Sequence, residues 1–218
     1  ASIEAITHDQ WWAGGIMRSV HRYASDGMII TMLLHMTRHF AFDKYRGFRW
    51  FSWITGVILI WLVYITGING FMLVWDKLAQ FVTVSTAELL DWIPIFKGVV
   101  IRNFIFEGHV NDRLFTLLAF IHLGAPLLVL MVMWIHVQRV PRAHTNPPKA
   151  IALWVTATFL ILSLVRPVVS QGPANLSVEV GALDFDWFYL PIYPLIYEWP
   201  LASLWGFLIG TSVFLYLL

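Results

Sequence analysis

Cysteine is absent from this sequence of 218 residues, and charged residues make up only 12% of it. Without cysteine the chain has no disulfide, no thiolate metal site and no thioether link to a c-type haem. The formal net charge is only +1 and no basic tract is present, so nothing favours a nucleic-acid partner. The first residues are polar and aromatic without a basic region, so we expect no cleavable signal peptide at Ala1.

Apolar residues are abundant instead and make up 59% of the chain. A soluble domain of this size needs more polar surface to cover its core, which indicates that lipid is the solvent. The chain also contains 12 Trp and 7 Tyr, residues that gather at membrane interfaces. The composition therefore predicts an all-α fold, a polytopic transmembrane helical bundle.

Five segments are long and apolar enough to cross the hydrocarbon, which takes about 20 residues. They are residues 17–40, 51–74, 114–137, 150–168 and 201–218. The stretch 76–112 is of mixed polarity and is interrupted at Pro94, so it predicts short helices at the interface. The stretch 171–200 contains prolines and many aromatic residues, and it predicts an irregular loop.

Basic residues gather in two of the connecting loops. The loop after the first segment contains Arg38, Lys44, Arg46 and Arg49 against one acid, Asp43, and the loop after the third contains Arg139, Arg142 and Lys149. The positive-inside rule places both loops on the cytoplasmic side, which agrees with five spans.

Four histidines form a regular pattern. His21 and His35 are 14 residues apart in the first segment, and His122 and His136 are 14 apart in the third. Fourteen helical residues advance by about 1400° and about 21 Å, so each helix presents two imidazoles on one face at opposite depths. Facing imidazoles at one depth can bind a haem iron from both sides, and two such pairs provide an electron path across the membrane.

A lone histidine in a membrane helix is more often a packing or proton-path residue. Equal spacing in two parallel segments favours haem over that interpretation. Zinc fits less well, because no third ligand joins either pair at its own depth. Histidines outside the pattern include His39, one turn after His35.

Residues near the histidines have two interpretations each. Arg18 and Arg38 lie three residues outward of His21 and His35, where they can bind haem propionates or anchor the helix ends. Glycines at 56, 67 and 70 in the second segment leave room for a flat macrocycle or for a neighbouring helix. For Asp26, both an ion pair with Arg22 and a role in proton movement remain open.

Several motifs resemble a known family, the cytochrome b of Rieske/cytochrome bc complexes and its chloroplast cytochrome bf relative. MRSVHRY at 17–23 and LHMTR at 34–38 resemble the family's second helix. TGV at 55–57 and TGINGFMLVWD at 66–76 resemble the third helix and its exit turn, and FIH at 120–122 with MWIH at 133–136 resembles the fourth. The resemblance covers roughly residues 1–140.

The resemblance implies a division of the chain. Residues 1–140 would form a di-haem bundle, with His21 and His122 holding the outer haem and His35 and His136 the inner haem. The family's first helix is not in the sequence, which implies that it lies upstream or on another chain. Residues 141–218 would add two transmembrane helices and an outer loop of the quinol-site region.

The family's Pro-Glu-Trp-Tyr motif has a divergent counterpart at residues 185–188. The resemblance implies that Asp186 takes the place of the glutamate that accepts a quinol proton. Phe185, Phe188 and Val74 depart from the proline, the tyrosine and the second proline of the family's outer quinol pocket.

The function implied is that of a di-haem b-type electron-transfer subunit in a quinol-oxidising, quinone-reducing respiratory or photosynthetic oxidoreductase complex. Two non-covalent b haems, quinone as substrate, and a Rieske protein or c-type cytochrome as partner follow from the resemblance. Quinone reduction is expected near Arg139 or Arg142. A bacterial inner membrane is preferred over a thylakoid or mitochondrial membrane.

Two alternatives remain. The divergent motif at Asp186 favours a non-bifurcating membrane anchor that connects a periplasmic redox enzyme to the quinone pool. The other alternative is a haem-free transporter or structural subunit.

Overall fold

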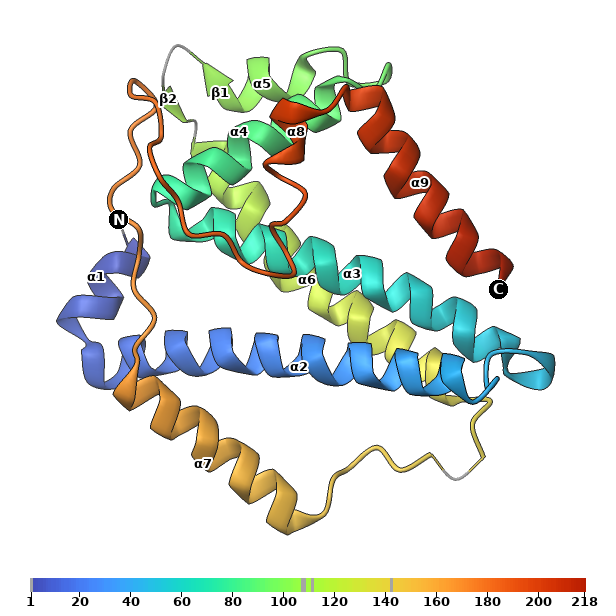
Figure 1. Cartoon of the computed structure of the whole chain (residues 1–218). Helices are drawn as coiled ribbons and strands as arrows, with labels where there is room; N and C mark the ends of the chain where they lie inside the picture. The colour runs from blue at the N-terminus through green and yellow to red at the C-terminus, as the bar shows by residue number, and fades with distance from the viewer. Residues whose placement is uncertain (1, 107–108, 111, 142) are drawn as a thin grey trace. The chain divides into compact units, whose positions relative to one another are not determined.

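The computed structural model describes residues 2–106, 109–110, 112–141 and 143–218, and this part of the chain is mainly helical (Figure 1). The chain divides into two compact units. The first unit contains the described residues of Ala1–Gly56 and Trp134–Ser170, and the second contains those of Val57–Met133 and Gln171–Leu218. The boundary predicted at residue 140 separates the expected di-haem bundle from the two further transmembrane helices. It stays a prediction.

The first unit contains α1 (Ser2–Asp9), a π-helical turn η1 (Trp11–Gly15), α2 (Ile16–Ala41), a short 3-10 helix η2 (Gly47–Arg49) and α7 (Lys149–Val165). The second contains α4 (Lys77–Asp91), α5 (Val99–Phe104), the antiparallel pair β1 (Ile105–Phe106) and β2 (His109–Val110), α8 (Leu195–Glu198) and α9 (Leu201–Leu217). Both units receive residues from α3 (Trp50–Val74) and α6 (Asp112–Val137).

Each of the five predicted segments coincides with a helix, namely α2, α3, α6, α7 and α9. The fourth is shorter than predicted and ends at Val165 instead of residue 168. The reason is Pro167, because a proline disfavours helical backbone in the residue before it. The described backbone between residues 171 and 194 contains no helix, as predicted, but the short helix α8 occupies residues 195–198 of the predicted loop.

Two helical segments of the described chain, Gly47–Val74 and Asp112–Val137, are both long enough and apolar enough to cross a membrane. Helices α7 and α9 are apolar but have only 17 residues each. Helix α2 has 26 residues but includes charged side chains. The predicted total of five spans therefore stays a prediction.

In the first unit, α2 packs directly against α7. A Cβ atom at Gly27 would lie 2.8 Å from Cζ of Phe159, so a larger residue at this position would displace the Phe159 ring. Ser19 Oγ accepts a hydrogen bond of 2.9 Å from the backbone N–H of Val168. The chain that leaves α7 is thereby fixed to the start of α2.

In the second unit, two side chains of α4 hold the start of the irregular loop. Asp76 caps α4 by accepting from the N–H of Ala79 and also accepts from the N–H of Gln171, both at 2.9 Å. Gln80 exchanges two hydrogen bonds with the backbone of Asn175, at 3.0 and 2.6 Å. These bonds satisfy backbone groups of a segment that has no ladder or helix of its own.

Replacing Asp76 with alanine removes both acceptors from a position that is only 7% exposed. We expect D76A to lower the free energy of unfolding by about 1–3 kcal/mol, because two backbone N–H groups lose their partner. Thermal unfolding of the purified protein measures the effect. The control is D184A, which alters an exposed side chain of the same loop; equal unfolding temperatures for the two variants would contradict the assignment.

Candidate functional site

The imidazoles of His35 and His136 face each other in the first unit. Their ring centroids are 6.4 Å apart and the ring planes are tilted by 59°. Two imidazoles that share one metal ion through bonds of about 2 Å have ring centroids roughly 6 Å apart. The pair predicted for the inner haem therefore has the separation that joint binding of one iron requires.

Thr55 orients the ring of His136. The Thr55 hydroxyl lies 2.8 Å from the carbonyl of Phe51, to which it donates, and 3.0 Å from Nδ1 of His136. Because the hydroxyl proton is already engaged, its oxygen accepts the Nδ1–H of the imidazole. Nε2 then keeps its lone pair, and this is the form in which histidine binds a metal.

His122 is held in the same way in the second unit. Its Nδ1 lies 3.1 Å from the carbonyl oxygen of Thr66. A carbonyl only accepts, so Nδ1 is protonated and Nε2 again keeps its lone pair. The two histidines of α6 are therefore both prepared as ligands by residues of α3.

Glycines of α3 make room for both rings. Gly56 and Gly70 are 14 residues apart, the same spacing as that of His122 and His136. A Cβ at Gly56 would lie 3.4 Å from Cε1 of His136, and one at Gly70 would lie 2.9 Å from Cε1 of His122. Gly67 differs, because it faces the ring of Tyr189.

His21 is an exposed residue of α2 in the first unit, whereas His122 belongs to the second unit. The pairing of these two residues stays a prediction. His39, which the pattern left aside, lies beside His35 with ring centroids 4.4 Å apart. The contact could have been predicted from the sequence, because residues four apart on one helix lie side by side.

The Arg18 side chain binds other side chains of the first unit. Its guanidinium donates to the hydroxyls of Thr7 and Ser170, each at 3.0 Å, and lies 3.6 Å from a carboxylate oxygen of Glu4. A hydrogen bond from Ser170 holds the pKa of Glu4 below its ordinary value, with smaller contributions from nearby positive groups. Arg38 is exposed in the last turn of α2. Contact of either arginine with a haem propionate stays a prediction.

Of the two roles left open for Asp26, the structure shows the ion pair. Its Oδ1 lies 2.7 Å from Nη1 of Arg22, one turn away on α2. After the end of α6, the Arg139 guanidinium lies over the ring of Phe51 at 4.4 Å from the centroid. Arg142, the other residue expected near a quinone, lies outside the described residues.

Asp186 caps a turn of its own loop. Its Oδ1 accepts from the backbone N–H groups of Phe188 and Tyr189, at 2.8 and 2.5 Å, and the residue is 8% exposed. Tyr189 is buried, and its ring is stacked near that of Tyr64 on α3. The carboxylate thus has a clear structural role.

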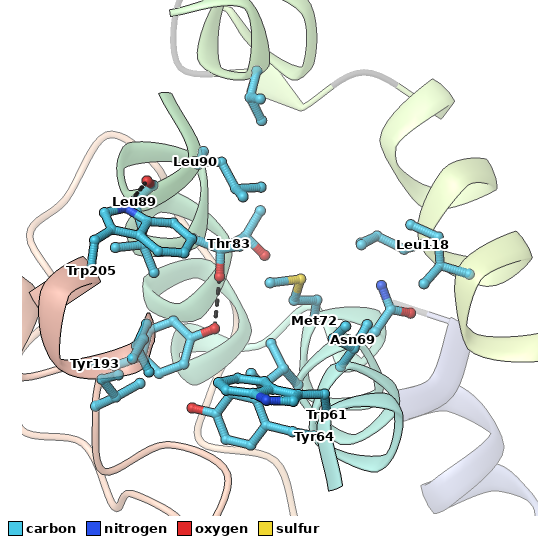
Figure 2. Close-up of a pocket in the computed structure, with 18 of the residues that line it drawn as sticks. Trp61, Tyr64, Asn69, Met72, Thr83, Leu89, Leu90, Leu118, Tyr193 and Trp205 are labelled. Atoms are coloured by element: carbon cyan, nitrogen blue, oxygen red, sulfur yellow. Dashed lines mark hydrogen bonds between the residues drawn. The ribbon is translucent and has the colours of Figure 1, made fainter. Parts of the chain in front are cut away.

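The second unit also has an apolar cavity of about 700 Å³ (Figure 2). Residues of α3, α4, α6 and α9 line it, together with Ile192 and Tyr193 of the loop. The Tyr193 hydroxyl lies 2.8 Å from that of Thr86, and burial raises the Tyr193 pKa, so the phenol is neutral. Asp186 is not among the described residues that line the cavity.

The sequence reasoning assigned no role to Thr55 or Thr66. A signal was available, since each precedes a glycine and the two Thr-Gly pairs are 11 residues apart. Eleven helical residues advance by about 1100°, close to three turns, so the two pairs share a face of α3. The cavity had no comparable signal, because residues from several helices and from the loop form it.

Known proteins resemble this chain over most of its length. Residues 26–173 match the family described as cytochrome b (N-terminal)/b6/petB. A cytochrome b6 from Gracilaria tenuistipitata var. liui is 28% identical over 151 residues, which cover 68% of this chain and 69% of that protein. A cytochrome b6 from Emiliania huxleyi is 29% identical over 107 residues, 49% of each chain.

The glycine opposite His122 provides a direct test. We expect G70A to displace the imidazole from the Thr66 carbonyl, because the new methyl would lie 2.9 Å from Cε1. The haem-to-protein ratio, measured by the pyridine haemochrome spectrum, should fall. G124A on α6 is the matched control, since its methyl meets no atom within 4 Å; a full haem content in G70A would refute the close approach.

Proposed function

The chain belongs to the cytochrome b (N-terminal)/b6 family, and from this membership we propose that it carries two b haems and conducts electrons from quinol across the membrane. The family identifies a membrane-bound, haem-binding cytochrome b, the electron-transfer subunit of a bc-type complex. The number of haems, the ligand set and the quinone chemistry are parts of the proposal.

The observation that carries the proposal is the arrangement of His35 and His136, with rings 6.4 Å apart and Nδ1 of His136 fixed by Thr55. His122 supports a second site, because its Nδ1 is fixed by the Thr66 carbonyl and Gly70 clears its ring face. For His21 the proposal rests on the sequence alone, namely on the equal spacing of the two histidine pairs. The residues present therefore fit the group that the family binds.

A bound b haem supplies one-electron redox chemistry at its iron. The protein contributes the orientation of the imidazoles, which Thr55 and Thr66 fix, and the clearance provided by Gly56 and Gly70. In apolar surroundings an unpaired imidazole N–H is costly, so these hydrogen bonds also stabilise the histidines within the helices. Arg18 and Arg38 are the cations proposed to face the propionates, at the outer and inner ends of α2.

At the outer side, Asp186 is proposed to accept a proton from quinol. The residue is only 8% exposed and lies in an aromatic loop, which gives the carboxylate a desolvated setting. The inner end, near Arg139, is the proposed place of quinone reduction. A Rieske protein or a c-type cytochrome is the proposed electron acceptor.

One observation favours the second candidate, a membrane anchor without bifurcated quinol oxidation. Asp186 already binds two backbone N–H groups and does not line the cavity of the second unit among the described residues. A carboxylate that caps a turn in this way can have a structural role instead of accepting a proton from quinol. The bacterial cytoplasmic membrane remains a proposal that gains no support from the reported relatives, which come from Gracilaria and Emiliania.

Removal of single ligands tests the haem assignment. H122A and H136A should each lose one haem and keep the other, so the haem-to-protein ratio falls from about two to about one. Dithionite-reduced spectra and gel filtration of the purified variants measure haem content and folding. H144A is the control, because this exposed histidine lies outside the pattern; retention of both haems in H122A and H136A would refute the ligand set.

The charge of Asp186 separates the two candidates. D186N keeps an oxygen for the turn but loses the proton acceptor, so haem reduction by a short-chain quinol should slow by about 100-fold or more. Stopped-flow absorbance measures that rate, and D184N is the control in the same loop. An unchanged rate in D186N, with an unchanged unfolding temperature, would favour the membrane anchor.

A further inference from the structure

The rings of the proposed ligands are held in different ways on α2 and on α6. Nδ1 of His136 meets the Thr55 hydroxyl, and Nδ1 of His122 meets a backbone carbonyl of α3. On α2, no described residue forms a hydrogen bond with the ring of His35. The χ2 torsion of a histidine is broad and roughly two-fold, so a ring without such a bond has a poorly defined plane. His35 therefore needs another support if it is to present a fixed face to a metal ion.

The ring beside His35 is that of His39, one turn further along α2. The two ring centroids are 4.4 Å apart and the planes are tilted by 52°. This separation is at the short end of the range for aromatic pairs, about 4.5–7 Å, so the rings are in van der Waals contact. Rotation of the His35 ring about χ2 moves its edge against His39. The contact therefore restricts the plane of the His35 imidazole.

His39 itself lies in a turn that is well fixed. Its carbonyl accepts a hydrogen bond of 2.8 Å from the backbone N–H of Lys44. Phe40, the next residue, stacks on the buried ring of Tyr45, and Tyr45 also contacts Trp53 at the start of α3. Helix ends commonly fray, but these contacts tie the last turn of α2 to the loop that follows it. His39 thus has a fixed place from which to support its neighbour.

The ring contacts also show which of these two α2 histidines faces α6. His136 has its ring centroid 6.4 Å from that of His35, and among the described ring contacts it has none with His39. An iron shared with His136 would therefore meet His35. This arrangement favours a role for His39 that acts through His35 over a role as a ligand.

We propose that His39 is a positioning residue of the inner haem site and that its ring sets the plane of the His35 imidazole. The inference rests on the proposed function, because it takes His35 as a ligand of haem iron. Residues behind a ligand orient it and tune the metal, and the angle between two axial imidazoles affects the energies of the iron d orbitals. In the structure the planes of His35 and His136 are tilted by 59°. His39 thereby influences the electronic state of the inner haem without touching the iron.

EPR spectroscopy of the oxidised, haem-loaded protein tests the proposal, because the low-field signal of a ferric bis-histidine haem shifts with the angle between its imidazole planes. The variants are H39A, which removes the ring, and H39F, which keeps a flat ring without nitrogen. T37A is the matched control, because Thr37 is an exposed residue of the same helical turn. H122A identifies the signal of the inner haem, since this variant should retain only that haem.

In H39A the low-field signal of the inner haem should shift and broaden, and its midpoint potential should shift as well, while the signal of the outer haem stays unchanged. H39F should keep the unaltered signal, because the ring contact remains. The haem-to-protein ratio should stay at about two in T37A and H39F. Loss of the inner haem from H39A alone would also support the positioning role.

Three results would overturn the inference: an unchanged inner-haem signal in H39A, the same change in H39A and H39F, or the same change in T37A. The haem content of the unaltered protein separates this outcome from a failure of the ligand assignment. Two haems together with an unchanged signal in H39A would overturn the inference alone. An unaltered protein without haem would overturn the inference and the proposed function together.

Discussion

The hydrogen bonds at Nδ1 of His122 and His136 are the constraint on which the rest of the site depends. An imidazole N–H surrounded by apolar side chains needs an acceptor, and α3 supplies one at each level, the carbonyl of Thr66 and the hydroxyl of Thr55. Each bond fixes the tautomer and the orientation of the ring together. Gly70 follows from the same requirement, since a Cβ there would crowd the ring of His122, whereas a Cβ at Gly56 would be in ordinary contact with the ring of His136.

Acidic and amide side chains of the second unit mainly serve the backbone of the irregular loop. Asp76 and Gln80 bind residues 171 and 175, and Asp186 binds the two amides that follow it. A loop without helix or ladder leaves many backbone groups to be satisfied, and in apolar surroundings side chains take over that role. This explains why polar residues persist in a chain that is otherwise poor in them.

The sequence predicted the helices well, because they rest on local periodicity. The haem-ligand candidates rest on the same periodicity and stay predictions. The histidine spacing and the glycine spacing are visible without coordinates, and the helix bounds differ by a few residues. The partners of Arg18 were not predictable, because Thr7 and Ser170 reach it from opposite ends of the first unit's sequence. The same holds for Gly67, whose neighbour Tyr189 is 122 residues away, and for the cavity, which depends on the packing of several helices.

Helix α4 connects two features that have been treated separately. Its first turn holds the loop through Asp76 and Gln80, and the next turn contributes Thr83 and Thr86 to the cavity wall. A helix of 15 residues moves nearly as a rigid rod, so a tilt that widens the cavity also pulls on residues 171–175. The same helix therefore positions both the wall of the cavity and the start of the loop, so a substitution that shifts α4 is expected to disturb both.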